Sequence, residues 1–209
     1  MIDKLLRLPK EKILEPLARG PLKNVSPNVI TISALAASLA AGGAAWQNEY
    51  GLALGFWYLN RLLDGLDGTV ARVNNKQSDF GGYLDIVLDM VAYVSKPQGL
   101  AFSTKRLYVF ISLTLLFASF YINSAAWMML AANLEKNKSG AKGNGELTSV
   151  TMPTAIIEGA EAVVIYSLFL LFPAYLPFLF GLLAVLVLLS AVIQVIWAYR
   201  HMDNRKDTQ

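Results

Sequence analysis

The chain has 209 residues, of which 55% are hydrophobic and only 16% are charged, and its formal net charge is +3. With a mean hydropathy of +0.45, it is too apolar for an ordinary soluble domain, and we expect an all-α polytopic membrane protein. Cysteine is absent and there is one histidine, which excludes a disulfide framework, a thiolate nucleophile and a His or Cys metal cluster. The basic residues lie mostly between apolar segments, which indicates membrane topology and no binding of nucleic acid.

Residues 1–25 mix Leu and Ile with Lys and Arg, and Pro9 and Pro16 prevent one long helix. We expect a juxtamembrane segment whose short amphipathic helix lies on the membrane surface. A disordered basic tail is the alternative interpretation. At the other end of the chain, residues 200–209 are polar and are expected to form a C-terminal tail.

Residues 26–199 are expected to form one transmembrane catalytic domain of six helices. Each predicted span is close to the ~20 residues that cross the hydrocarbon core of a bilayer. In the first span, small residues recur at every fourth position, which favours the close approach of another helix; these are Ser33, Ala37, Ala41 and Ala45. The spans are predicted at residues 28–46, 49–71, 80–102, 107–133, 154–173 and 175–199.

The basic residues also predict how the protein is oriented. If both termini are cytoplasmic, all of the 18 Lys and Arg residues except Lys96, Lys105 and Arg106 lie on the cytoplasmic side. We therefore expect an integral protein of the inner or plasma membrane, if bacterial, with the loop between the second and third spans in the cytoplasm. Lys96 is expected to approach the far interface or to snorkel towards it, and the sequence suggests no function for it.

Four aspartates flank the expected turn between the second and third spans. Asp64 and Asp67 are three residues apart and Asp85 and Asp89 are four apart, so each pair projects from one helical face. A reversal between them would bring the four carboxylates together, and such a cluster at a membrane boundary needs cations to balance it. The residues expected in this reversal are Asn74, Asn75, Ser78, Asp79, Gly81 and Gly82.

Carboxylates without His or Cys favour hard divalent ions such as Mg²⁺ or Mn²⁺, and two ions would balance four charges. A pair of such ions about 3.5–4 Å apart supports displacement at phosphorus. Small residues nearby leave room for a ligand, and Arg72 can bind phosphate oxygens in bidentate fashion. Taken singly, the glycines could serve only helix packing, and Arg72 could be only a topology anchor. Arg61, three residues before Asp64, is expected to pair with an aspartate or to touch a substrate phosphate.

Residues 64–89 match a family signature at every specified position. The pattern D-x2-DG-x2-AR-x8-G-x3-D-x3-D begins at Asp64 and ends at Asp89, and it resembles the signature of the CDP-alcohol phosphatidyltransferases. The Pro-Asn-x-x-Thr sequence at residues 27–31 resembles the start of the family's first helix, and six spans agree with the family's plan.

The resemblance implies an enzyme that transfers a substituted phosphate from a CDP-linked donor, here CDP-diacylglycerol, to a small alcohol and releases CMP. It implies that Asp64, Asp67, Asp85 and Asp89 hold two metal ions and that Asp89 is also the general base. A homodimer is implied as well. The residues implied to bind the CDP donor are Asn28, Thr31, Gly68, Ala71, Arg72 and Gly81. A site at the membrane boundary suits this reaction, because a lipid donor can stay in the bilayer while a small alcohol enters from the cytoplasm.

The start of the fifth span offers Glu158 and Glu161 and no Lys or Arg, and it is the region expected to select the acceptor. This charge pattern favours a non-phosphorylated acceptor, for example an amino alcohol. Three lysines on the preceding loop, Lys136, Lys138 and Lys142, leave a phosphorylated acceptor such as glycerol phosphate open. The two glutamates could instead only complement the dipole at the start of a helix.

Two other functions remain open at this stage. The substrates could be reversed, so that a phospho-amino alcohol moves from a soluble CDP-alcohol to diacylglycerol at the same residues. A divalent-cation transporter is a different class, because acidic residues within membrane helices often mark ion pathways. The clustering of the aspartates at one boundary argues against the transporter.

Overall fold

The computed structural model describes residues 13–136, 156–157 and 159–202. Within these residues the regular elements are all helical, which confirms the expected all-α class. Residues 13–19 form a short helix. The later helices are α2 (Pro27–Trp46), α3 (Tyr50–Val73), α4 (Asp79–Thr104), α5 (Leu107–Lys136), α7 (Gly159–Leu171), a 3-10 turn (Pro173–Tyr175) and α8 (Leu176–Met202).

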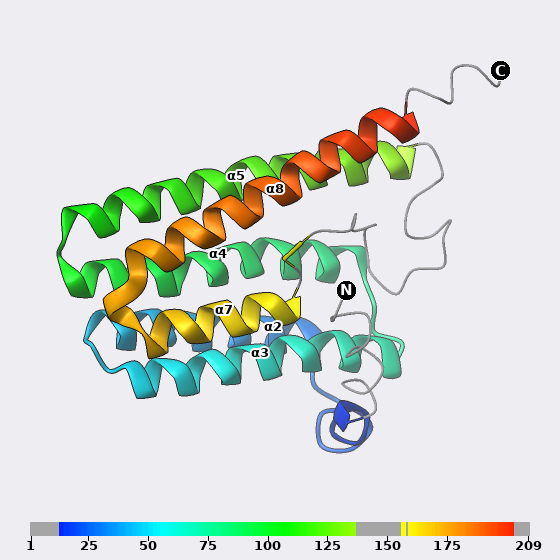
Figure 1. The fold of residues 1–209 in the computed structure, drawn as a ribbon. Helices are drawn as coiled ribbons and strands as arrows, with labels where there is room; N and C mark the ends of the chain where they lie inside the picture. The colour runs from blue at the N-terminus through cyan, green and yellow to red at the C-terminus, as the bar shows by residue number, and fades with distance from the viewer. Residues whose placement is uncertain (1–12, 137–155, 158, 203–209) are drawn as a thin grey trace.

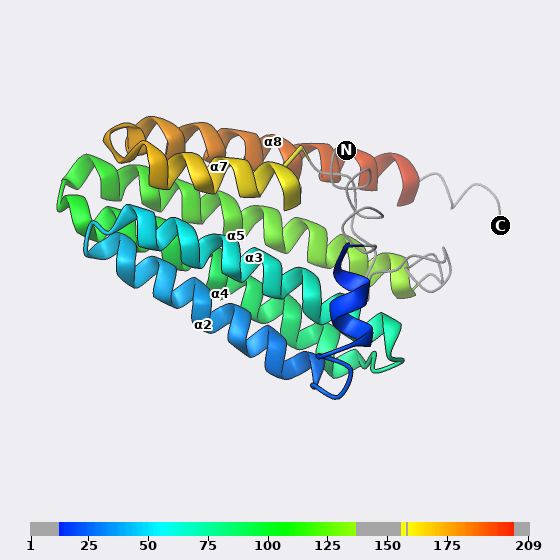
Figure 2. The ribbon, with the colours of Figure 1, turned by 90° about the horizontal axis from the view of Figure 1, so that it is seen from below.

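The long helices run side by side in one bundle (Figure 1). Helices α3 and α4 both pack on α2, while α5 packs along α8. Helix α7 contacts α3, α4 and α8, and so joins the two groups. The helix of residues 13–19 lies across one end of the bundle (Figure 2), where its Leu14 and Ala18 are buried with Ile30, Leu66 and Val70 of α2 and α3.

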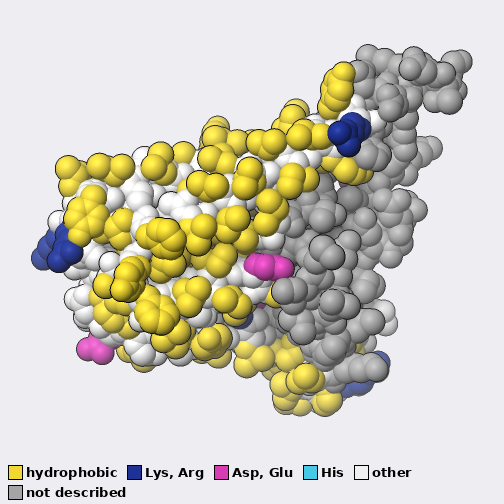
Figure 3. Space-filling model, viewed as in Figure 1, with side chains coloured by type: hydrophobic (Ala, Val, Ile, Leu, Met, Phe, Trp, Pro, Cys, Tyr) yellow, Lys and Arg dark blue, Asp and Glu magenta, His cyan; other side chains and the backbone are white. Residues whose placement is uncertain are grey.

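Three helical runs are long and apolar enough to cross a membrane: Pro27–Trp46, Leu107–Lys136 and Pro173–Arg200. Helix α7 is shorter, at 13 residues, which corresponds to about 20 Å of helix. Hydrophobic side chains cover most of the described surface on the face shown in Figure 3. An apolar exterior of this kind is what lipid contact requires.

Several observed helix bounds differ from the predicted spans, most of all at the start of the fifth. The fifth helix begins at Gly159, because residues 156 and 157 form a bend where the span was expected to have begun. Helix α8 extends to Met202 and so includes the first residues of the predicted tail. The reversal between α3 and α4 is shorter than expected, because Gly81 and Gly82 belong to the first turn of α4. The Ser78 side chain accepts a hydrogen bond from the Gly81 N–H at 3.0 Å and caps the helix there.

Close packing of α2 against other helices was expected from its small residues. Ala37, Ala41 and Ala45 are buried, as that pattern predicts, whereas Ser33 is exposed. Helices α2 and α4 also approach closely beside Ala41, where a Cβ at residue 99 would overlap the carbonyl group of residue 42. Both positions are glycine, so the two backbones can touch.

Candidate active site

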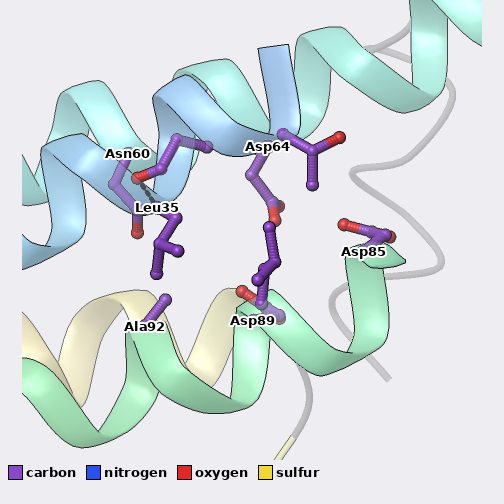
Figure 4. Close-up of a pocket in the computed structure, with 9 residues that line it drawn as sticks. Leu35, Asn60, Asp64, Asp85, Asp89 and Ala92 are labelled. Atoms are coloured by element: carbon purple, nitrogen blue, oxygen red, sulfur yellow. Dashed lines mark hydrogen bonds between the residues drawn. The ribbon is translucent and has the colours of Figure 1, made fainter. Parts of the chain in front are cut away.

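A narrow pocket lies between α2, α3 and α4 (Figure 4). Three of the four predicted aspartates line it: Asp64 on α3, and Asp85 and Asp89 on α4. Asp64 points from α3 towards α4, where the other two carboxylates lie (Figure 4). We expected α3 and α4 to pack directly on each other, but each packs on α2 instead, and the aspartates reach one site from two helices that flank α2.

The fourth aspartate, Asp67, is turned inwards and is only 5% exposed. Its Oδ1 accepts a hydrogen bond from the Gly68 N–H at 2.5 Å, but its Oδ2 is buried without a hydrogen-bond partner. A buried carboxylate oxygen costs free energy unless a cation or a donor meets it. An oxygen of this kind is a suitable ligand for a hard divalent ion, which prefers oxygen ligands.

The convergence of the four carboxylates is nevertheless partial. Among the described residues, no three Asp, Glu, His or Cys side chains are close enough together to hold a metal ion. The enclosed part of the pocket measures about 10 Å³, which is close to the minimum that holds one water molecule. This space is far smaller than a nucleotide, so a CDP group would have to bind on the open side of the pocket.

Arg61 supplies a cation to the aspartates from the protein itself. Its Nη2 donates to Asp89 Oδ1 at 2.7 Å, and its Nη1 lies 3.6 Å from Asp64 Oδ2. Of the two roles considered for Arg61, the structure shows the ion pair. The guanidinium also lies 4.9 Å from the ring centroid of Trp57 and 5.2 Å from that of Tyr93, so aromatic faces confine it.

Four of the predicted donor-binding residues form two neighbouring pairs. The guanidinium of Arg72 folds over Gly68, so that a Cβ there would lie 3.0 Å from Nη1. Asn28, at the start of α2, lies beside Gly81 at the start of α4, where a Cβ would lie 3.2 Å from Asn28 Oδ1. In both pairs the glycine leaves the space that the polar side chain occupies. Larger residues at positions 68 and 81 would displace that side chain.

The two remaining residues predicted to bind the donor are Thr31 and Ala71. Thr31 is buried, donates to the carbonyl oxygen of Pro27 at 3.0 Å, and lines the pocket with the aspartates. Ala71 is half-buried on α3 between Gly68 and Arg72, and so shares their helix turn.

The N-terminal segment anchors the turn that connects the two aspartate pairs. Asn74, which ends α3, donates from Nδ2 to the carbonyl oxygen of Ala18 at 3.0 Å. Lys76 donates from Nζ to the carbonyl oxygens of Lys23 and Val25 at 2.6 and 3.1 Å. These long-range bonds fix the α3–α4 turn against the chain that enters α2.

Of the two predicted acceptor residues, the structure describes only Glu161. Glu158 lies outside the described residues. Glu161 lies in the first turn of α7, is half-buried, and is not among the residues that line the pocket. Its position at a helix start agrees with either interpretation considered for it.

The prediction for Lys96 is wrong. Lys96 is 1% exposed and does not snorkel; its Nζ donates to Ser38 Oγ at 2.6 Å and to the carbonyl oxygen of Ala92 at 2.5 Å. Helical side chains point back towards the helix N-terminus, which here directs Lys96 along α4 towards Asp89. Ser38, on the helix rich in small residues, is the partner that could have indicated a buried position for Lys96. The two residues are 58 positions apart, however, and no rule of sequence spacing connects residues so distant.

Comparison with known proteins identifies the family of this chain. The sequence profile described as CDP-alcohol phosphatidyltransferase matches residues 24–199. The inner membrane protein YnjF of Escherichia coli is 31% identical over 151 residues, which is 72% of each chain. The archaetidylinositol phosphate synthase of Pyrococcus horikoshii is 32% identical over 96 residues, or 46% of this chain and 50% of that one.

Solved structures of the phosphatidylinositol phosphate synthase of Mycobacterium tuberculosis share the fold. The structure with CDP-DAG bound has a TM-score of 0.67 at 22% identity and covers 88% of this chain and 92% of its own. The structure in complex with manganese and citrate has a TM-score of 0.68 at 21% identity, with 89% and 88% covered. From the match over residues 24–199 and the complete aspartate signature, this chain belongs to the CDP-alcohol phosphatidyltransferase family, the integral membrane enzymes of phospholipid synthesis.

Proposed function

We propose that the chain transfers a phosphatidyl group from CDP-diacylglycerol to the hydroxyl of a small polar alcohol and releases CMP. The observation that carries this proposal is the pocket that gathers Asp64, Asp85 and Asp89. Asp67, whose Oδ2 is buried without a hydrogen-bond partner, lies about one helical turn after Asp64 on α3. The structure of the M. tuberculosis enzyme with CDP-DAG bound supports the choice of donor.

The same four aspartates would hold two divalent ions, Mg²⁺ or Mn²⁺. When bound, such ions neutralise the pyrophosphate and stabilise the departing CMP. The donor set supports this assignment, because it consists of oxygens and includes one buried oxygen with no other partner. The manganese in the M. tuberculosis structure supports it independently.

The side chains then divide the work of the reaction. Asp89 accepts the proton of the acceptor hydroxyl as the oxygen attacks phosphorus, and Arg61 keeps its carboxylate in place through the 2.7 Å ion pair. The residues that bind the CDP part of the donor are Asn28, Thr31, Gly68, Ala71, Arg72 and Gly81. Positioning of the two substrates and neutralisation of the pyrophosphate charge supply most of the remaining acceleration.

The membrane arrangement is part of the proposal. Helices α2, α3, α4, α5, α7 and α8 cross the bilayer, with the site and both termini on the cytoplasmic side. The helix of residues 13–19 lies at that surface, and two copies form a homodimer. The distribution of Lys and Arg supports the orientation, and the apolar exterior of the helices supports the crossing.

A non-phosphorylated acceptor fits the charges around the pocket. None of the described residues that line the pocket is Lys or Arg, and Arg61 beneath it is engaged by Asp64 and Asp89. Glu158 and Glu161 would help to define the acceptor pocket. Two relatives are named as synthases of inositol phosphate lipids, so a phosphorylated acceptor must also be tested.

The test is to incubate the purified protein with CDP-diacylglycerol, Mg²⁺ or Mn²⁺, and a panel of alcohols, and to measure CMP and the lipid product. The panel includes amino alcohols, glycerol phosphate and inositol phosphate. We expect CMP release that depends on the metal and on a non-phosphorylated alcohol. A parallel reaction with CDP-amino alcohols and diacylglycerol tests the reversed substrates. No reaction with any CDP donor, together with cation flux in liposomes, would overturn the proposal in favour of a transporter.

A further inference from the structure

Lys96 is a charged residue buried within the bundle, with no place in the signature of the family. Besides its hydrogen bonds to Ser38 and Ala92, its ammonium lies 4.4 Å from the ring centroid of Trp57 and 5.7 Å from that of Tyr166. Burying a cation in a membrane helix is costly, and replacing it by an apolar residue would ordinarily favour stability. Packing alone therefore does not explain a lysine here.

Two basic side chains, those of Arg61 and Lys96, contact the ring of Trp57. Arg61 lies 4.9 Å from its centroid and Lys96 lies 4.4 Å from it, so both fall within the range of a cation–π contact. Tyr166 of α7 also contacts this arrangement: it stacks on Trp57 with 5.2 Å between the ring centroids and donates to the carbonyl oxygen of Tyr93 at 2.8 Å. We refer to Trp57, Arg61, Tyr93, Lys96 and Tyr166 as the cation–aromatic cluster.

This cluster lies directly behind the reacting groups. Lys96 and Asp89 are seven residues apart on α4 and therefore share one helical face. Ala92, whose carbonyl oxygen accepts the bond from Lys96, lines the pocket. The Lys96 side chain thus lies behind the pocket residue Ala92. Arg61, which contacts the same Trp57 ring as Lys96, is bonded to Asp89.

We propose that Lys96 is a positioning residue for Asp89, acting through Trp57 and Arg61; the proposal rests on the function proposed above for Asp89. Lys96 holds the indole ring, the ring confines the guanidinium of Arg61, and the guanidinium fixes the carboxylate that receives the acceptor proton. Lys96 itself is enclosed by protein and does not touch substrate. Its loss loosens the base without altering the residues that bind the CDP donor.

The test is to measure kcat and KM for the donor and the acceptor in Lys96→Met, whose apolar chain fills similar space. A base displaced by about 1 Å can cost up to about a hundredfold in rate, so we expect kcat to fall about ten- to a hundredfold. Donor KM should stay within about twofold. Lys96→Arg keeps a cation over the ring and should be faster than Lys96→Met. Ser38→Ala removes one of the two hydrogen bonds of Lys96, together with the bonds of the hydroxyl to Ala92 and Ser95, but keeps the lysine, and should be affected less than Lys96→Met.

Two controls separate positioning from general damage. Lys105→Met removes an exposed lysine just beyond the end of α4 and should leave kcat unchanged. Phe169→Leu disturbs the core beside Tyr166 and should lower the melting temperature without lowering the kcat of the folded protein. If the wild-type protein is active and folded Lys96→Met has the same kcat, the positioning role of Lys96 is overturned while the proposed function stands. A wild type that releases no CMP would instead overturn the proposed function on which it rests.

A second variant keeps the proposal testable if Lys96→Met does not fold. Trp57→Phe retains an aromatic face but offers a weaker site for cations. We expect the same pattern, a lower kcat with an unchanged donor KM. In the double mutant with Lys96→Met, the loss of kcat should be smaller than the two single losses combined, because both residues act through Arg61. A normal kcat in Trp57→Phe, or full additivity in the double mutant, would contradict the proposed connection.

Discussion

Helices α2, α3 and α4 bury different kinds of side chain from the pair α5 and α8. The first group buries Asp67, Lys96 and Asn60, and it holds the ion pair of Arg61 with Asp89. Among the described residues, α5 and α8 bury no charged side chain and meet mainly through aliphatic residues and Phe180. Because buried charge is costly in a membrane, its restriction to one group of helices marks where the protein does its chemistry.

The same difference is visible in the hydropathy of the chain. The run Pro173–Arg200 has a mean hydropathy of 2.8, the highest of the three apolar runs, whereas α3 and α4 are not among them. The two helices that carry the aspartate signature are therefore not recognised as membrane spans by length and hydropathy. In this protein, hydropathy and catalytic residues give complementary information about the spans.

The largest expected effect comes from the catalytic group of helices. Asp89→Asn should leave the protein folded and able to bind CDP but lower turnover by about a hundredfold or more, because it removes both a base and a metal contact. The measurement is CMP release at saturating substrates, with nucleotide binding followed separately. Asp79→Asn is the matched control, since Asp79 is an exposed aspartate at the start of the same helix. Near-normal turnover in Asp89→Asn would exclude Asp89 from both roles.

A smaller effect is expected at the open side of the pocket. Arg72→Lys keeps the charge but loses the bidentate fork, so donor KM should rise by about tenfold and acceptor KM by much less. Gly68→Ala should act in the same direction, because its methyl group would push the guanidinium away. Arg106→Lys, beyond the opposite end of α4, is the control for the chemical change itself. Unchanged donor kinetics would leave Arg72 as a topology anchor only.

The sequence predicted most of this architecture for identifiable reasons. The apolar character of the chain predicted an all-helical bundle, and the aspartate spacing predicted that Asp64, Asp85 and Asp89 come together. The packing of α3 and α4 on α2, and the short α7, were not predicted. The cation–aromatic cluster could not be predicted, because its members come from α3, α4 and α7 and are brought together only by tertiary packing. Lys96 was misplaced because a lone lysine in a span ordinarily reaches for the interface, whereas Ser38 and Trp57 satisfy it inside the bundle.

The acceptor prediction concerns α7, which joins the two groups of helices. If Glu158 and Glu161 define the acceptor pocket, Glu158→Gln combined with Glu161→Gln should raise acceptor KM about threefold or change the ranking of alcohols, with donor KM within about twofold. Glu49→Gln, just before α3 and at its far end from the aspartates, is the control. If the glutamates only complement the helix dipole, the double mutant will lose about 0.3–1 kcal/mol of stability and keep the same acceptor ranking.

The smallest effect on catalysis is expected in the apolar pair of helices. Leu183 and Leu182 are neighbours on α8, but Leu183 is 1% exposed and Leu182 is 44% exposed. Leu183→Ala opens a cavity in the core and should destabilise the protein by about 2 kcal/mol or more, whereas Leu182→Ala should cost much less. Thermal unfolding in detergent measures this difference, and CMP release below the unfolding range measures turnover. Because neither residue is near the buried charges, both variants should keep the wild-type kcat and KM. A lower kcat in folded Leu183→Ala would show that packing of α8 reaches the pocket through α7, and the division between a catalytic and an apolar group of helices would then fail.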